Sequence, residues 1–137
     1  MLGNQHLAPL PVWELLFNNM PEESRKIATE RLKFSLTYQK KRGIVSEEAQ
    51  DLPDGAADRI RDIAKRVYRT LKISGYARID LRLSEGGRVY VIEANPNPQL
   101  SRDEDFAQSA LKAGLDYGEL IQRILNLGLR WEPARLG

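Results

Sequence analysis

The sequence contains no cysteine and a single histidine, His6. Disulfide frameworks and thiolate metal sites are therefore excluded, and one imidazole cannot form a zinc site with others of its kind. Any metal ion bound to this chain has to be held by oxygen ligands. No apolar run approaches the roughly 20 residues that span a bilayer, and the first residues lack the order of a signal peptide. We expect a cytoplasmic protein that does not bind a membrane.

An excess of charge of one sign is also missing, because 21 basic residues stand against 19 acidic ones, a formal net charge of +2. This balance is weak support for a nucleic-acid partner. A basic cluster at 65–72 alternates with an apolar stripe at helical spacing from Ile60 to Leu71, so its charges belong on the solvent face of a helix. Nucleic-acid binding, which would require strongly salt-dependent affinity, therefore ranks last among the functions that we consider.

What the sequence does contain fits one ordinary folded domain. Its 137 residues are 42% hydrophobic and 29% charged, within the range of globular proteins that form a packed core. The clearest element is a helix over 56–73, which starts after a good N-cap residue, Asp54, and stops at Gly75.

Turn residues and β-branched runs predict the other elements. The expected fold class is α+β, with a mainly antiparallel sheet packed with helices. The expected elements are one or two short strands within 1–17, a partly ordered, helical connection over 22–43, a hairpin with strands near 76–83 and 88–94, helices over 106–113 and 117–129, and a loose tail over 131–137.

Charged side chains interrupt both strands of the hairpin. Because side chains alternate along a strand, Arg78 and Asp80 share one face of the first strand, and Glu93 and Asn95 share one face of the second. Val89 and Val91 are expected on the same face as Glu93. A two-residue loop at Glu85 and Gly86 would give the pairs Ser84–Gly87, Asp80–Val91 and Arg78–Glu93.

This register makes Asp80 and Glu93 diagonal neighbours about 7 to 8 Å apart, whereas a slip of one residue would put them on opposite faces. Mg²⁺ prefers carboxylate and carbonyl oxygens, so Asp80, Glu93 and the amide oxygen of Asn95 are candidate ligands. Arg78 adds a planar cation for a phosphate or a developing oxyanion. The pattern also fits a structural alternative, in which Arg78 and Glu93 form a cross-strand ion pair while Asp80 and Arg82 face solvent.

The stretches GYARIDLRL, from Gly75, and GRVYVIEANPNPQLS, from Gly87, resemble the C-terminal part of the ATP-grasp fold, in particular its D-alanine:D-alanine ligase-like branch. In that branch R-x-D, about a dozen residues and then E-x-N close the metal site, and here Glu93 follows Asp80 by 13 positions. The segment SALKAGLDYGELIQRIL, from Ser109, resembles the terminal helices of the branch. The resemblance covers most of residues 1–129.

The resemblance implies a ligase that joins a small carboxylate to an amine through an acylphosphate, with ATP and Mg²⁺, or Mn²⁺, as cofactors. By position, Asp80, Glu93 and Asn95 would be ligands of two metal ions. Arg78 would be catalytic and would stabilise the acylphosphate and the tetrahedral species formed from it. Lys33 and Glu93 would contact the nucleotide.

Two departures from the pattern bear on the acceptor substrate. Gln99 stands where D-alanine ligases have a glycine whose backbone helps hold the oxyanion. Glu104 and Asp105 fall where those ligases have a Ser-Leu stretch that receives the carboxylate of the second D-alanine. Two acidic residues would repel a carboxylate, so we expect an amine-bearing or otherwise different acceptor instead of the cell-wall dipeptide substrate.

Nothing within 1–74 resembles the glycine-rich phosphate-covering loop that family members carry. We therefore expect residues 1–130 to be an incomplete C-terminal portion of an ATP-grasp domain, followed by the tail, and the isolated chain to bind Mg²⁺ and nucleotide weakly without turnover. The alternative is a degenerate, non-catalytic fragment that acts as a binding or assembly module, as a homodimer through an exposed sheet edge within 1–17.

Overall fold

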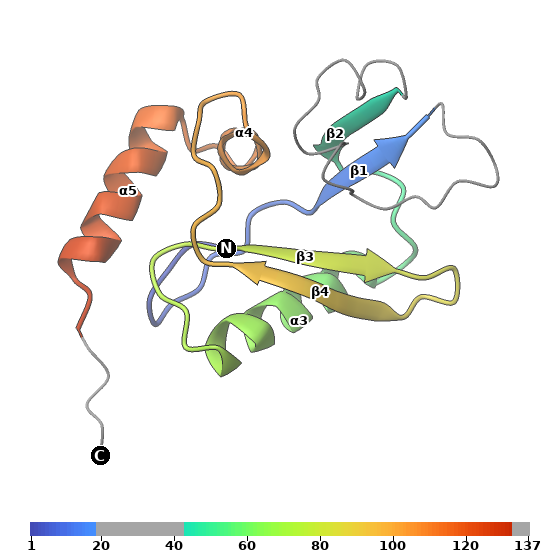
Figure 1. Cartoon of the computed structure of the whole chain (residues 1–137), viewed down its shortest axis with the longest axis horizontal. Coiled ribbons are helices and arrows are strands. Elements are labelled where there is room, and N and C mark those ends of the chain that lie inside the picture. Colours follow the sequence, from blue (N-terminus) through green and yellow to red (C-terminus); the bar gives the residue numbers. More distant parts are fainter. Residues whose placement is uncertain (19–42, 133–137) are drawn as a thin grey trace. The chain divides into compact units, whose positions relative to one another are not determined.

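The computed structural model describes residues 1–18 and 43–132, so most of the connection expected over 22–43 and the tail residues 133–137 lie outside the described residues. The chain forms two compact units, one of Met1–Val12 with Gln50–Gly137 and one of Trp13–Ala49. The fold class is α+β with antiparallel strands, as expected. The elements are β1 (Trp13–Phe17), β2 (Ile44–Glu48), α3 (Ala56–Thr70), β3 (Arg78–Leu83), β4 (Val89–Asn95), α4 (Asp105–Lys112) and α5 (Tyr117–Leu129) (Figure 1).

The smaller unit contains one antiparallel strand pair. β1 and β2 pair in regular register from Trp13↔Glu48 to Phe17↔Ile44. The first strand was expected from its apolar run, whereas the second was not, because only Ile44 and Val45 give it β-branched character before two glutamates follow.

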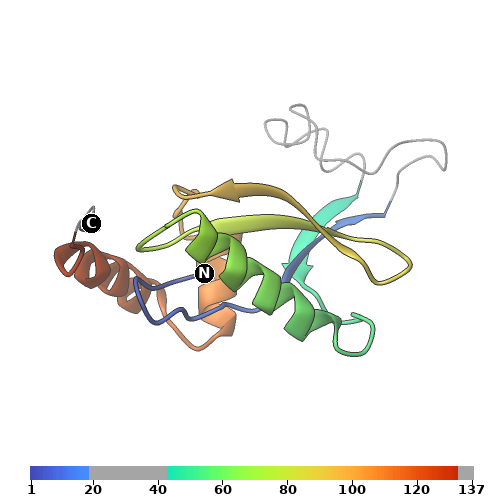
Figure 2. The ribbon, with the colours of Figure 1, turned by 90° about the horizontal axis from the view of Figure 1, so that it is seen from below.

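Helix α3 packs on the hairpin of the larger unit and lies along it in Figure 2. Its buried side chains recur once per turn, at Ala56, Ile60, Ala64 and Tyr68, which gives the apolar stripe that the sequence predicted. Tyr68 donates a 2.8 Å hydrogen bond from its hydroxyl to the backbone oxygen of Gly3, and burial raises the pKa of Tyr68 to about 12. The helix therefore joins the N-terminal segment to the sheet.

The predicted start of α3 at residue 56 is confirmed, whereas its predicted N-cap residue and its predicted end at residue 73 were wrong. The N-cap position is taken by Gly55 in a left-handed conformation, not by Asp54, and no side chain caps the helix there. At the other end the helix stops at Thr70 because Lys72 adopts a positive φ of 54°. The N–H groups of Lys72 and Ile73 then bond to the carbonyls of Arg69 and Tyr68, which is a Schellman arrangement and leaves Gly75 outside the helix end.

The main core of this unit lies between the N-terminal segment and the last two helices. Leu2 is wholly buried and forms bridges with Ala8 and with Tyr76, just before β3. Helices α4 and α5 lie close to their predicted ranges, and Asp116 and Glu119 form a capping box at the start of α5. The core cluster consists of Leu2, Phe106, Ala107, Ala110 and Leu120.

Candidate functional site

The β3–β4 hairpin turns through three residues, not the predicted two. Ser84 pairs with Arg88: the N–H of Ser84 donates to the oxygen of Arg88 at 2.9 Å, and that of Gly87 donates to the oxygen of Ser84 at 2.9 Å. Gly87 has a φ of 76°, as the last position of a three-residue hairpin loop requires. The predicted pairs of Ser84, Asp80 and Arg78 are consequently wrong.

A β-bulge at Ile92 then shifts the ladder a second time. Leu81 pairs with Val91, but the next residue of β3, Asp80, pairs with Glu93, which leaves Ile92 as the extra residue of β4. The turn alone would have sent Glu93 to the other face, and the bulge returns it. Asp80 therefore lies directly opposite Glu93, and Arg78 lies opposite Asn95.

The two shifts also correct the faces that we assigned to the first half of β4. Val89 pairs with Leu83 and Val91 with Leu81, so these valines share the apolar face of the hairpin with the two leucines. Tyr90 pairs with Arg82 on the polar face. The predicted grouping of Glu93 with Asn95 is kept, because both residues follow the bulge.

Arg78 and Asp80 form the ion pair of this face. Arg78 donates from Nε to Oδ1 of Asp80 at 2.7 Å and from Nη2 to Oδ2 at 2.9 Å, a bidentate arrangement between side chains that are 38% and 31% exposed. The hydrogen bonds to Asp80 raise the pKa of Arg78; partial burial opposes this rise, and the charges of Glu93 and Asp105 add to it. The alternative cross-strand pair of Arg78 with Glu93 is not formed.

The amide of Asn95 is held by the turn that follows β4. Its Oδ1 accepts a 2.9 Å hydrogen bond from the backbone N–H of Asn97, and Oδ1 of Asn97 accepts one of 2.9 Å from the hydroxyl of Tyr76. The ring of Tyr76 contacts that of Phe106 edge-on, at 5.7 Å between centroids. Asn97 and Tyr76 thus support the site, and the Asn-Pro-Asn-Pro spacing was the sequence signal that could have indicated this turn.

The oxygen donors of this face fit a hard divalent cation. Residues directly opposite on antiparallel strands have Cβ atoms about 4.5–5.5 Å apart, close enough for the carboxylates of Asp80 and Glu93 to share an ion. Within residues 1–18 and 43–132 there is no cluster of three or more His, Asp or Glu side chains suited to a metal, so a ligand set here needs the amide of Asn95 or groups of a substrate. Lys33, the expected nucleotide contact, lies outside the described residues.

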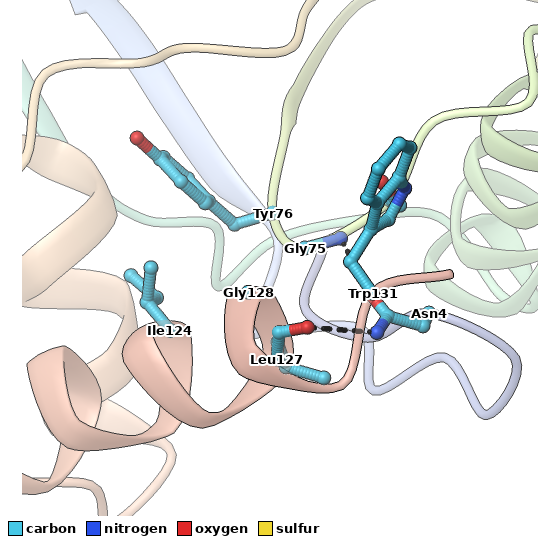
Figure 3. Close-up of a pocket in the computed structure, with 8 residues that line it drawn as sticks. Asn4, Gly75, Tyr76, Ile124, Leu127, Gly128 and Trp131 are labelled. Carbon is cyan, nitrogen blue, oxygen red and sulfur yellow. Dashed lines mark hydrogen bonds between the residues drawn. The ribbon is translucent and has the colours of Figure 1, made fainter. Parts of the chain in front are cut away.

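Two pockets of the larger unit are lined by other residues. One, of about 220 Å³, lies between α5 and the segment before β3, and its lining includes Tyr76, Ile124 and Trp131 (Figure 3). Asn4 also lines this pocket, and it donates to the oxygen of Leu127 at 3.0 Å and accepts from the N–H of Gly75 at 2.9 Å. The other, of about 240 Å³, lies beside Arg102, which stacks 4.6 Å above the ring of Tyr117. Neither pocket includes the charged residues of the hairpin.

The sequence matches a known family along most of its length. Residues 20–126 match the family model described as the D-ala D-ala ligase C-terminus. The chain belongs to this family. The predicted resemblance to the D-alanine:D-alanine ligase-like branch is therefore confirmed, and the hairpin of a D-ala D-ala ligase C-terminus carries the residues described above.

Curated relatives are longer than this D-ala D-ala ligase C-terminus. The protein of Sinorhizobium fredii named uncharacterized protein y4sG is 31% identical over 130 residues, which are 95% of this chain and 37% of the relative. The D-alanine--D-alanine ligase of Desulfotalea psychrophila is 27% identical over 139 residues, 100% of this chain and 40% of that protein. The chain thus spans about two fifths of the length of these relatives.

Solved structures support the fold. The D-alanine--D-alanine ligase of Bacillus anthracis complexed with ATP matches with a TM-score of 0.59 and 31% identity, over 63% of this chain and 30% of that one. The VanG D-Ala:D-Ser ligase of Enterococcus faecalis matches with a TM-score of 0.67 over 92% of this chain and 34% of that one, at 18% identity. The second likeness concerns the fold alone. No helix in the described ranges is long and apolar enough to cross a membrane.

Proposed function

We propose that this chain is the metal- and nucleotide-binding half of an ATP-dependent carboxylate:amine ligase. The direct pairing of Asp80 with Glu93, with Asn95 two residues further along β4, supports this proposal most strongly. It presents three oxygen donors on one face of a hairpin, next to the guanidinium of Arg78. The family match and the relative that binds ATP support the same reaction class.

The proposed reaction has two steps. A carboxylate oxygen of the first substrate attacks the γ-phosphorus of ATP, ADP leaves, and the amine of the second substrate then attacks the acyl carbon and releases phosphate. Bound Mg²⁺ would neutralise phosphate charge during the first step. Asp80, Glu93 and Asn95 would hold Mg²⁺, Arg78 would donate hydrogen bonds to the phosphoryl oxygens of the acylphosphate, and Lys33 and Glu93 would contact the nucleotide.

The acceptor is proposed to differ from the D-alanine of cell-wall synthesis. Asp103 and Glu104 lie just before α4 and are exposed, and Asp105 is the first residue of that helix. Negative charge at this segment favours an acceptor that carries an amine without a nearby free carboxylate.

Binding of Mg²⁺ and ATP by the 137-residue chain tests the proposal without requiring turnover. A ligand that binds only the folded state stabilises it by about 2.7 kcal/mol at a hundredfold excess over Kd, so thermal unfolding should shift upward by several degrees when both are added. We expect Asp80→Asn and Glu93→Gln to abolish this shift while leaving the circular dichroism spectrum unchanged.

Glu85→Gln is the matched control, because Glu85 lies in the turn of the same hairpin, exposed and away from the paired carboxylates. It should keep the full shift. An unchanged shift in Glu93→Gln would exclude Glu93 from the metal site, and the absence of any shift in the unmodified chain would argue against the proposed function itself.

A second candidate function is the non-catalytic binding or assembly module. Three consecutive apolar side chains of β4 favour it, since Tyr90, Val91 and Ile92 are 53%, 48% and 65% exposed. Exposed apolar residues on a strand are typical of interaction surfaces.

A further inference from the structure

The ion pair of Arg78 with Asp80 occupies the carboxylate that is proposed to bind metal. Both oxygens of Asp80 accept a hydrogen bond from the guanidinium, at 2.7 and 2.9 Å. A carboxylate has about four lone-pair positions, and the bidentate guanidinium of Arg78 uses one on each oxygen. The carboxylate of Asp80 is thus already neutralised by a cation that belongs to the chain.

Guanidinium and metal ion would compete for this carboxylate. If Mg²⁺ took the remaining lone pairs, the two cations would lie about 5 Å apart, and their repulsion in a water-like dielectric lowers metal affinity by about tenfold. If Mg²⁺ displaced the guanidinium from Asp80, Arg78 would lose two charge-assisted hydrogen bonds. In either case Arg78 weakens the binding of metal alone.

Nucleotide changes this balance. The phosphate oxygens of a metal–nucleotide complex offer the guanidinium new acceptors, and they are arranged for bidentate contact as the Asp80 carboxylate is. Glu93 lies opposite Asp80 and leaves a second carboxylate for the ion. When metal and nucleotide bind together, the guanidinium of Arg78 therefore exchanges Asp80 for phosphate oxygens with little loss of free energy.

We infer that Arg78 is an internal counter-ion of Asp80 that lowers the affinity for free Mg²⁺ and couples metal binding to nucleotide binding. The inference rests on the proposed metal site. It predicts that one substitution changes two affinities in opposite directions. Arg78→Gln should bind metal alone more tightly and the metal–nucleotide complex more weakly.

Binding of Mn²⁺ to the 137-residue chain, followed by electron paramagnetic resonance, measures the first effect. We expect about tenfold tighter Mn²⁺ binding in Arg78→Gln, and little change in Arg78→Lys, which keeps the positive charge. Arg88→Gln, which removes an exposed arginine just before β4, should not change the affinity. Arg78→Met, which keeps an unbranched aliphatic stem, serves as a second uncharged variant if the glutamine variant does not fold.

Calorimetric titration with a non-hydrolysable ATP analogue in saturating Mg²⁺ measures the second effect. Binding should weaken about tenfold in Arg78→Gln because the charge-assisted hydrogen bonds to phosphate are lost. A merely structural role of Arg78 would change both affinities in the same direction.

The outcomes separate this inference from the proposed function. If the unmodified chain binds Mn²⁺ and the uncharged variants bind it equally or more weakly, Arg78 is not a counter-ion, and the metal site remains. If none of these proteins binds Mn²⁺, the metal site and the inference are both wrong. Binding by the uncharged variants alone would support the inference most directly.

Discussion

At the scale of single residues, the close approach of the N-terminal segment to itself leaves no room for a side chain at Gly3. Its φ is 133°, its N–H bonds to the oxygen of Gly75, and a Cβ atom there would clash with the backbone oxygen of His6. We expect Gly3→Ala to lower the free energy of unfolding by about 3 kcal/mol or more, because backbone strain and steric overlap combine. Chemical denaturation of the two proteins measures the difference.

Gly114→Ala separates these two contributions. Gly114 has a φ of 85°, but no heavy atom lies within 4 Å of its added Cβ. The loss should therefore be about 1 kcal/mol, the cost of a left-handed conformation alone. Equal losses in the two variants would show that the clash at Gly3 is relieved by movement of the segment.

The charged residues of the candidate site could be chosen from the sequence, but their partners could not. Alternation along each strand was sufficient to place Arg78 with Asp80 and Glu93 with Asn95. The cross-strand pairs depend on the length of the turn and on the bulge at Ile92, and neither has a unique signal in the run from Ser84 to Ile92. Two register errors cancelled, and for this reason both carboxylates were still expected on one face.

At the scale of elements, the C-terminal end of α3 carries a residue poorly suited to its conformation. Lys72 has a φ of 54°, in the left-handed region where a side chain costs about 1–2 kcal/mol and glycine does not. Lys72→Gly should raise the free energy of unfolding by about 0.5–1 kcal/mol, since the extra freedom of glycine in the unfolded chain offsets part of the gain. Urea denaturation is a suitable measurement.

Lys65→Gly is the matched control, because the same change within α3 should destabilise the protein by about 1 kcal/mol. Destabilisation by both variants would mean that the side chain of Lys72 contributes more than its conformation costs.

Helices were located more accurately than strands because their signals are longer. The apolar stripe of α3 and the glycines Gly114 and Gly118 placed the helices to within a few residues. Strand β2 was missed because five residues with two glutamates carry little periodicity, and its pairing with β1 is set by contacts between segments distant in sequence.

At the scale of the whole molecule, the two proposed functions predict different masses in solution. The assembly alternative places a dimer interface within residues 1–17, yet the first part of this segment is used within its own unit. Leu2 is wholly buried, and backbone hydrogen bonds join Leu2 to Ala8 and Gly3 to Gly75. Among the described residues, the outer edge of β4 has no partner strand and carries the exposed Tyr90, Val91 and Ile92.

We therefore expect light scattering to give the mass of a monomer at micromolar concentration, and any self-association at higher concentration to involve β4. Ile92→Lys places a charge on this exposed edge without disturbing a buried contact, so it should abolish such association and leave the melting temperature unchanged. Leu15→Lys in β1 is the matching variant for the interface that the assembly alternative places within residues 1–17. A dimer that persists at low concentration would favour the assembly module. Its loss in Leu15→Lys alone would place the interface within residues 1–17, and its loss in Ile92→Lys alone would place the interface on β4.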